Sequence, residues 1–293
     1  MSHTDQLLNQ LQQKIFAVDT PDIVFDCDQT LLDGDIGEAF LAELLLQLEI
    51  NPSDQWWALL GDDAISIRDL YRKQYSDPLV TTLSDACFIM LWNTYEALIQ
   101  KDVYMAYIWA ASCLEGWLVN DARSRCQQFV MDALDRPSQP TYWANDSHQI
   151  DIQRGVRRRD ILFNWIKTLQ SQHGQIWVIS SSLQYLVDEI CTPLALTSTS
   201  ICGIEFLEDD MQRLTLNPKQ PTPISHDKIQ AFQSRSHRSV PRCMVGDSHH
   251  DLPLMKHADL GLLICSPHST VLAEVNSKNI LSLSPNLLSS EQR

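Results

Sequence analysis

Two aspartates follow a short apolar run near the start of the chain, in IVFDCDQTLLDGD (residues 23–35). Side chains of a strand alternate between its two faces, so Asp26 and Asp28 can point into the same space while Cys27 points away. If a phosphoryl group binds there, one carboxylate can attack phosphorus and form an aspartyl-phosphate. The other can donate a proton to the leaving oxygen and later accept one from water. An acidic turn after a strand is the alternative interpretation.

Electrostatic repulsion opposes this chemistry. A carboxylate that approaches a phosphate oxygen to about 4 Å is repelled by about 4 kcal/mol at an effective dielectric constant of about 20. Mg²⁺ held by oxygen ligands would reduce this repulsion. The stretch VGDSHHDLPLM (residues 245–255) supplies more carboxylates: Gly246 permits a tight turn, Asp247 is expected to face the crevice, and Asp251 lies one helical turn further on. Together the two stretches predict a Mg²⁺ site.

Phosphate oxygens also need hydrogen-bond donors. Ser180 and Ser181, with Ser182, are expected at the start of a helix, where they offer hydroxyl groups and backbone N–H groups. Lys228, in HDKIQAF, offers a positive charge near the start of another helix. The alternative interpretations are that Ser180 only caps a helix and that Lys228 is an ordinary surface lysine.

The elements that must position these residues are indicated by three short apolar runs, which are typical of strands buried on both faces of a parallel sheet. Helical patterns alternate with them, and two weaker strand patterns follow the third run. This alternation predicts an α/β fold with a Rossmann-like three-layer core. The predicted strands span residues 23–25, 176–179, 243–245, 261–265 and 280–283, and the predicted helices span residues 159–172 and 183–190.

Each of the three apolar runs ends at a polar residue, which is Asp26, Ser180 or Asp247. In open α/β sheets, ligands bind outside the carboxyl ends of the strands. We therefore expect these three residues, which are far apart in the sequence, to meet in one crevice.

The segment from residue 37 to residue 149 lacks buried-strand runs and carries helix-period patterns. It is predicted to be an all-helical cap domain, inserted into a core domain of residues 1–36 and 150–293. Residues 136–149 (RPSQPTYWANDSHQ) are rich in turn formers and are expected to be the return linker. Residues 204–216 are expected to form a hairpin that turns at Asp209-Asp210.

Six of the eight tryptophans lie in the predicted cap domain. They either pack its helices or form a cage for a cationic head group, through cation–π contacts of about 0.5 to 2 kcal/mol per ring. Trp56 and Trp57 are the cage candidates, on the argument that two adjacent tryptophans of one helix cannot both face its core. Asp33, Asp35 and Glu38 either cap the next helix or face the substrate.

The motifs DCDQT (26–30), the apolar run that ends at Ser180, a lone Lys228 and GDSHHD (246–251) occur in the order of the four motifs of the haloacid dehalogenase superfamily. The whole layout resembles the phosphoserine-phosphatase-like branch of that superfamily, with a helical cap after the first motif. The resemblance implies the following roles: nucleophile for Asp26, general acid/base for Asp28, Mg²⁺ binding by Asp26, the backbone carbonyl of Asp28 and Asp247, support of the metal site by Asp251, and binding of the phosphoryl group by Ser180 and Lys228.

Asp28 favours ester hydrolysis over carbon–halogen cleavage, because dehalogenase members of the superfamily lack an acid at this place. The second motif reads SSS, where the phosphoserine enzymes have glycines after the serine. We expect a Mg²⁺-dependent phosphomonoesterase for a small phosphorylated metabolite, with phosphocholine, phosphoethanolamine and phosphoserine as candidate substrates. The alternatives are a phosphotransferase of the same fold and a non-catalytic protein that binds a phosphorylated metabolite.

The composition argues against several classes of partner. The formal net charge of −15 repels nucleic acid and anionic membrane surfaces, and the only basic cluster lies at residues 154–159. No signal peptide or long apolar run is found, so a soluble cytoplasmic protein is expected. Eight cysteines without a CxxC pair are expected to be reduced and mostly buried. Cys27 is expected to pack in the core, with an oxidation switch as the alternative.

Overall fold

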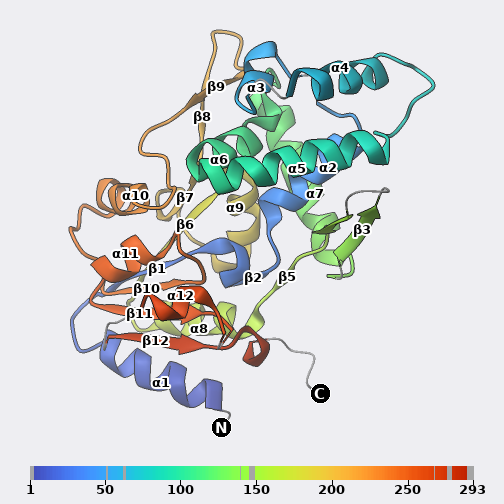
Figure 1. The fold of residues 1–293 in the computed structure, drawn as a ribbon. Coiled ribbons are helices and arrows are strands. Elements are labelled where there is room, and N and C mark those ends of the chain that lie inside the picture. The colour runs from blue at the N-terminus through green and yellow to red at the C-terminus, as the bar shows by residue number, and fades with distance from the viewer. Residues whose placement is uncertain are drawn as a thin grey trace. The chain divides into compact units, whose positions relative to one another are not determined.

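The computed structural model describes residues 3–50, 52–61, 64–138, 140–144, 149–266, 268–275 and 279–288 (Figure 1). The chain divides into two compact units. Unit 1 comprises Met1–Asp33, Arg157–Gly203 and Pro221–Arg293, and unit 2 comprises Gly34–Val156 and Ile204–Gln220. The second segment of unit 2 lies in the part of the chain that the sequence assigned to the core domain.

A six-stranded sheet forms the centre of unit 1. The neighbouring strands from β12 to β6 pair in parallel, as expected for an α/β fold. In spatial order the strands are β12 (Ile280–Leu283), β11 (Leu260–Ile264), β10 (Cys243–Gly246), β1 (Asp22–Phe25), β6 (Gln175–Leu183) and β7 (Ile201–Ile204).

The three strongest apolar runs are neighbours at the centre of this sheet. Ile23 of β1 is in register with Cys243 of β10 and with Ile176 of β6. One boundary was predicted wrongly: β6 continues to Leu183, so the serines at 180–182 lie in a strand and not at the start of a helix. The following helix, α9, begins only at Gln184.

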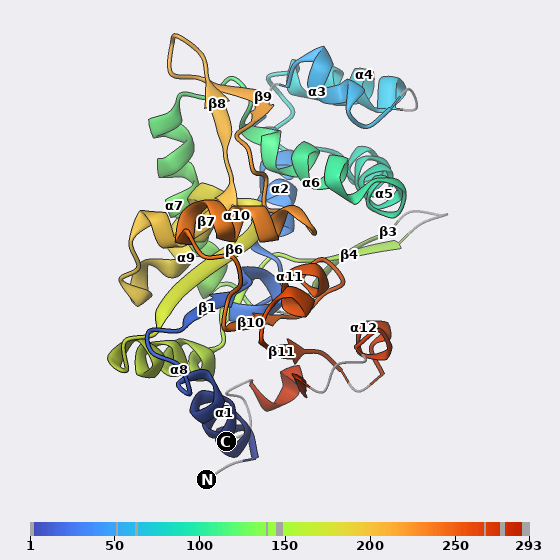
Figure 2. The same cartoon turned by 90° about the vertical axis from the view of Figure 1, so that its left-hand side faces the viewer.

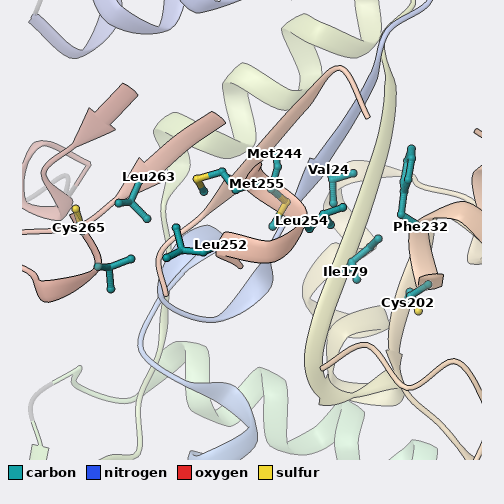
Figure 3. Packing of buried hydrophobic residues seen from close by; sticks show 12 residues of the cluster. Val24, Ile179, Cys202, Phe232, Met244, Leu252, Leu254, Met255, Leu263 and Cys265 are labelled. Carbon is teal, nitrogen blue, oxygen red and sulfur yellow. The ribbon is translucent and has the colours of Figure 1, made fainter. Parts of the chain in front are cut away.

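Helices cover both faces of the sheet, which gives the predicted three layers. Val24, Met244 and Leu263 from adjacent strands pack in one buried cluster with Phe232 of α10 and Met255 of α11 (Figure 3). Figure 2 shows α8 on the other side of β1. The Trp165 ring of that helix meets the Phe25 ring edge to face, with 5.8 Å between the ring centroids. The helices of unit 1 are α1 (His3–Ile15), α8 (Asp160–Ser171), α9 (Gln184–Cys191), α10 (Asp227–Ser236), α11 (Leu252–His257) and α12 (Thr270–Ala273).

Short segments connect the sheet of unit 1 to unit 2 along the chain. An irregular turn, η1 (Cys27–Leu31), follows β1 and leads into β2 (Leu32–Asp33). β2 pairs antiparallel with β5 (Arg157–Arg158), so the chain leaves unit 1 and returns to it along two paired strands. Three short 3₁₀ helices complete the unit: η3 (Thr192–Leu194), η4 (Ser198–Ser200) and η5 (Pro285–Leu287).

Unit 2 is mainly but not entirely helical, which corrects the all-helical prediction. Its helices are α2 (Ile36–Leu46), α3 (Asp54–Ala58), α4 (Ala64–Tyr75), α5 (Asp85–Lys101), α6 (Val103–Ala111), the 3₁₀ helix η2 (Ser112–Leu114) and α7 (Val119–Asp135). Two antiparallel hairpins belong to it as well: β3 (Pro140–Ala144) with β4 (Gln149–Gln153), and β8 (Phe206–Glu208) with β9 (Leu214–Pro218).

The first hairpin replaces the linker that was expected at residues 136–149. Ile150 and Ile152 are buried and Asp151 between them is exposed, so β4 has the period-two pattern of a half-buried strand. The second hairpin confirms the pairing predicted for residues 204–216. The segments around it are joined by the backbone N–H of Lys219, which donates to the carbonyl of Glu205 at 2.8 Å.

All eight cysteines are buried and none forms a disulfide, as predicted. Within the described ranges, the longest apolar helices are too short or too polar to cross a bilayer.

Candidate active site

The ends of β1 and β10 bring the predicted carboxylates together. Asp26 is the first residue after β1, and its backbone N–H donates to the carbonyl of Val245 in β10 at 2.9 Å. One oxygen from each of Asp26, Asp247 and Asp251 lies within 4.8 Å of the others. Asp26 and Asp251 are buried, and Asp247 is half-buried. Parallel pairing of the two strands therefore builds an acidic cluster, as expected.

Lys228 lies inside this cluster. Its ammonium group, 2% exposed, donates to Oδ1 of Asp26 at 2.7 Å and to Oδ1 of Asp251 at 2.6 Å. Burial alone would lower the pKa of Lys228, but the charges of the two aspartates outweigh burial and raise it. The interpretation of Lys228 as a surface lysine is therefore wrong.

Asp251 holds the turn after β10 in place. Its Oδ2 accepts hydrogen bonds from the backbone N–H of Asp247 at 3.0 Å and from both the backbone N–H and the hydroxyl of Ser248, at 3.1 and 3.0 Å. Burial would raise the pKa of Asp251, but Lys228 and these donors lower it. A Cβ at Gly246 would lie 2.6 Å from Cβ and Cγ of Asp251, so only glycine leaves room for this carboxylate.

The other two carboxylates of the cluster, Asp26 and Asp247, have raised pKa values. Burial, followed by the charge of Asp251, raises the pKa of Asp26 to about 8, although Lys228 opposes the shift. Burial and the charges of Asp251 and Asp26 raise the pKa of Asp247 well above its ordinary value. Both shifts indicate that the pocket carries more negative charge than one lysine can balance.

The donor set suits a divalent cation. When all three carboxylates are ionised they face one ammonium group, so the four residues together carry two uncompensated negative charges that a divalent cation would balance. Carboxylate oxygens are the ligands that Mg²⁺ prefers, at about 2.0 to 2.1 Å. The oxygens of Asp251 already accept four hydrogen bonds. Asp26 and Asp247 are therefore the better placed ligands, with Asp251 as their support.

The Asp28 carboxylate does not join this cluster. Its Oδ2 accepts hydrogen bonds from the hydroxyl of Ser182 at 2.7 Å and from that of Ser180 at 3.3 Å. The hydroxyl of Ser181 points elsewhere and donates to the carbonyl of Pro223 at 3.0 Å. The alternation of β6 thus brings two of the three serines to Asp28 and turns the middle one away.

The turn between Asp28 and β2 has its own anchors. Gln29 adopts a left-handed conformation (φ 54°), and the hydroxyl of Thr30 donates to Oδ1 of Asp247 at 3.1 Å. The Arg159 guanidinium, 3% exposed, donates to the carbonyl of Leu32 at 3.2 Å and pairs with Asp33 at 3.2 Å. Arg159 thus fixes the segment that follows the two motif aspartates.

Sequence reasoning missed the roles of Thr30, Ser182, Ser248 and Arg159. Thr30 and Ser248 stand inside the quoted motifs, so their position was a usable signal. The role of Ser182 could have been predicted only with the correct end of β6, because strand geometry places Ser182 on the same side as Ser180. Arg159 appeared only as part of a basic cluster, and its burial could not be read from the sequence.

The residues proposed as substrate contacts lie in unit 2. Trp56 and Trp57 are 0% and 2% exposed, so the argument that two adjacent tryptophans cannot both be buried is wrong. Their rings touch each other at 4.9 Å between centroids, and that of Trp56 also meets Trp109 at 4.4 Å. In the described chain neither ring offers an open face for a cationic head group, so their role is packing.

The acidic residues at the end of β2, at the start of α2 and between them have separate partners. Asp35 caps α2, since its side chain accepts a hydrogen bond from the backbone N–H of Glu38 at 2.8 Å. The carboxylate of Glu38 accepts a hydrogen bond from the hydroxyl of Tyr95 at 3.4 Å. Asp33 pairs with Arg159. Of the two alternatives, capping the next helix or facing the substrate, Asp35 thus adopts the first.

Two solved structures share this fold. A conserved, functionally unknown protein from Anaerococcus prevotii DSM 20548 is 15% identical, with a TM-score of 0.71 over 96% of this chain and 94% of that one. A protein of unknown function from Bordetella pertussis Tohama I is 11% identical, with a TM-score of 0.57 over 89% of this chain and 97% of that one. At these identities the likeness shows the fold alone.

A third structure is less similar. It is a HAD family hydrolase from Salmonella enterica serovar Typhi, 14% identical, with a TM-score of 0.48 over 94% of this chain and 75% of that one. This likeness is too weak to support an argument. No protein-family model and no curated protein matches the sequence. The fold that the chain shares with the first two structures is therefore an α/β fold around a parallel sheet.

Proposed function

We propose that this protein is a Mg²⁺-dependent phosphomonoesterase of the haloacid dehalogenase type, which hydrolyses a small phosphorylated metabolite through an aspartyl-phosphate on Asp26. One observation carries the proposal: three carboxylates and a buried lysine meet at the ends of β1 and β10, and a further carboxylate, Asp28, follows two residues later. A site that only bound a phosphate ester would have no use for an acid at position 28.

The first half of the reaction transfers the phosphoryl group to the protein. A carboxylate oxygen of Asp26 attacks phosphorus and forms a new P–O bond, while the P–O bond to the alcohol breaks. Asp28 gives its proton to the leaving oxygen, so the alcohol departs neutral and Asp28 becomes ionised.

The second half releases phosphate. Asp28 now takes a proton from a water molecule, whose oxygen attacks the phosphorus of the aspartyl-phosphate. The bond between phosphorus and Asp26 breaks, which regenerates the Asp26 carboxylate and the protonated Asp28. One proton donor thus serves both halves of the cycle, and no other base is needed.

The remaining polar residues hold charge in place. Lys228 can bond one phosphoryl oxygen while it lowers the pKa of Asp26, and the Ser180 hydroxyl can turn from Asp28 to another phosphoryl oxygen. Asp26, the carbonyl of Asp28 and Asp247 would hold Mg²⁺, with Asp251 as support. When bound, the cation neutralises the negative charge of the carboxylates and of the phosphoryl oxygens.

Unit 2 is proposed to act as the cap over this site. Closure of such a unit excludes water from the reaction and limits the size of the substrate, which favours small metabolites over phosphoproteins. Since Trp56 and Trp57 are buried, these two tryptophans give no support to a preference for amine phosphates.

Turnover of 4-nitrophenyl phosphate, measured with Mg²⁺ and with excess chelator, tests the proposal. We expect activity only with Mg²⁺, and we expect Asp26→Asn to abolish both turnover and the acid-quenched phosphoprotein formed from ³²P-labelled substrate. Activity that survives either change would contradict the mechanism. Tight binding of phosphate esters without turnover would indicate a binding protein, and phosphoryl transfer to added glycerol faster than to water would indicate a phosphotransferase.

A further inference from the structure

We infer that Ser182 is the residue that positions the proposed acid, Asp28, and that it does so while Ser180 binds the phosphoryl group. This inference rests on the proposed function of the site. In the described part of the chain, the hydrogen bonds of Ser182 go to Asp28 and Ser180 and not to the carboxylate cluster. Ser182 is therefore a positioning residue.

Three hydrogen bonds link Asp28, Ser180 and Ser182 to one another. The Ser182 hydroxyl donates to Oδ2 of Asp28 at 2.7 Å, and the Ser180 hydroxyl donates to the same oxygen at 3.3 Å. The backbone N–H of Ser182 in turn donates to Oγ of Ser180 at 3.0 Å. Because that bond occupies a lone pair of the Ser180 oxygen, the Ser180 proton is directed to Asp28.

The two hydroxyl bonds differ in strength. A bond of 2.7 Å lies at the most common O–H···O distance, whereas one of 3.3 Å is beyond the usual range. Ser180 can therefore exchange Asp28 for a phosphoryl oxygen at little cost, and Ser182 then remains as the hydroxyl anchor of Oδ2. A hydroxyl that donates to Oδ2 makes this oxygen the acceptor, so the proton of the carboxyl group is carried by Oδ1.

Burial makes the anchor rigid. Ser182 is 8% exposed and Ser180 is fully buried, so both side chains have their orientation fixed by the strand. Ser182→Ala removes the 2.7 Å bond but keeps the backbone N–H that orients Ser180. The substitution thus tests the bond from Ser182 to Asp28 separately from the hydroxyl of Ser180, which is proposed to bind the phosphoryl group.

The test compares leaving groups. A good leaving group such as 4-nitrophenolate departs without a proton, whereas 4-methoxyphenolate depends much more on one. We propose to measure kcat/KM for an aryl phosphate series between these two, since this constant reports transfer to Asp26 and not the later attack by water. For Ser182→Ala we expect a loss of about tenfold or more with the poor leaving group and less than about threefold with the good one, because general acid catalysis contributes about 10²- to 10⁴-fold.

Matched variants complete the experiment. Ser181→Ala removes a hydroxyl from the same strand that bonds Pro223 instead of Asp28, so the ratio of its rates for the two leaving groups should equal that of the wild type. Ser182→Thr retains the hydroxyl and should restore that ratio, and Ser182→Cys replaces the alanine variant if alanine prevents folding. Equal losses on both substrates in a folded Ser182→Ala protein would overturn the inference and leave the proposed function intact. A wild-type protein that hydrolyses neither substrate would overturn both.

Discussion

Lys228 stabilises two buried carboxylates at once, so its removal should affect folding as well as turnover. Lys228→Met keeps most of the side-chain volume but leaves Asp26 and Asp251 without their cation. Breaking a buried ion pair costs about 3 to 5 kcal/mol. We therefore expect a loss of that order in the free energy of unfolding, measured by urea denaturation with tryptophan fluorescence in chelator, together with loss of phosphatase activity.

A matched control is available at the surface. Lys219 pairs with Glu205 at 3.1 Å, and its side chain is 43% exposed. Exposed pairs contribute about 0 to 1 kcal/mol, so Lys219→Met should leave the unfolding curve almost unchanged. Equal destabilisation by the two substitutions would contradict the role given to Lys228.

The raised pKa of Asp26 predicts a pH dependence of stability. In the ion-free protein this carboxyl group titrates near 8, against 3.8 in the unfolded chain. Between these values the folded state holds the extra proton, so the contribution of Asp26 to the free energy of unfolding falls as pH rises and is lost above about 8. In chelator, Asp26→Asn should therefore gain stability relative to the wild type from pH 5 to pH 8. A difference in the free energy of unfolding that stays constant over that range would contradict the raised pKa of Asp26.

At the scale of residues, the sequence predicted proximity where strand pairing decides it, whereas the catalytic roles of the residues stay predictions. Asp26 and Asp247 lie together as expected, because parallel strands align the ends of their apolar runs. Ser182 could not be assigned, since its role depends on where β6 ends. Three consecutive serines resemble a helix start as much as a strand, and only pairing within the sheet decides between them.

At the scale of elements, the tight turn after β10 depends on one glycine. A methyl group at Gly246 would overlap Asp251 at 2.6 Å, and the carboxylate must then withdraw from the N–H groups of Asp247 and Ser248. We expect Gly246→Ala to lower kcat for 4-nitrophenyl phosphate by at least about tenfold, because small displacements of catalytic groups have large effects on rate. A variant with unchanged kcat and unchanged urea midpoint would show that the close approach is not needed.

The aromatic packing of unit 2 contains a second testable feature. The indole N–H of Trp56 is buried and has no hydrogen-bond partner among the described residues. A buried, unsatisfied donor costs about 1 to 3 kcal/mol, so Trp56→Phe loses ring contacts but also removes this cost. Trp165 is similarly buried, but its indole N–H donates to Gln12 at 3.1 Å.

We therefore expect Trp56→Phe to be less destabilising than Trp165→Phe, by about 1 kcal/mol for the hydrogen bond that only the second substitution breaks. Urea denaturation of the two variants gives the comparison. If Trp56→Phe were as destabilising as Trp165→Phe, the indole of Trp56 must be bonded in solution, for instance to a buried water molecule.

The predicted strands were accurate for three of the short apolar runs. Residues 23–25 and 243–245 agree within a residue at each end with β1 and β10, whose residues are all buried, and residues 280–283 also match the edge strand β12. The hairpin of β3 and β4 was missed because prolines and polar residues at 136–149 indicated a loop. The alternation in QIDIQ (149–153) was the signal that would have revealed it.

For the whole molecule, the net charge of −15 should slow the approach of anionic substrates. Salt screens this repulsion, with a Debye length of about 10 Å at 0.1 M. With Mg²⁺ kept saturating, kcat/KM for a phosphate ester should therefore rise by up to a few fold between low salt and about 0.15 M salt. A fall over this range would show that the local field at the pocket, and not the overall charge, guides the substrate.

The α/β architecture was predictable from the sequence, but the membership of residues 204–220 in unit 2 was not. Local pattern identified β8 and β9 as a hairpin, yet it carries no information about the elements on which a hairpin packs. Leu118 and Arg213 form an isolated antiparallel bridge, which ties this hairpin to the start of α7. Such contacts between residues far apart in the sequence can be known only from the three-dimensional structure.

Each of the two segments that make up unit 2 begins and ends next to backbone that is hydrogen-bonded together. β2 lies beside β5, and the backbone of Glu205 bonds that of Lys219. The number of residues between such paired ends can change while the two ends stay hydrogen-bonded to each other. Shortened or exchanged inserts are thus compatible with an unchanged arrangement of the carboxylates and Lys228 in unit 1, so the proposed site and unit 2 can vary independently from one relative to another.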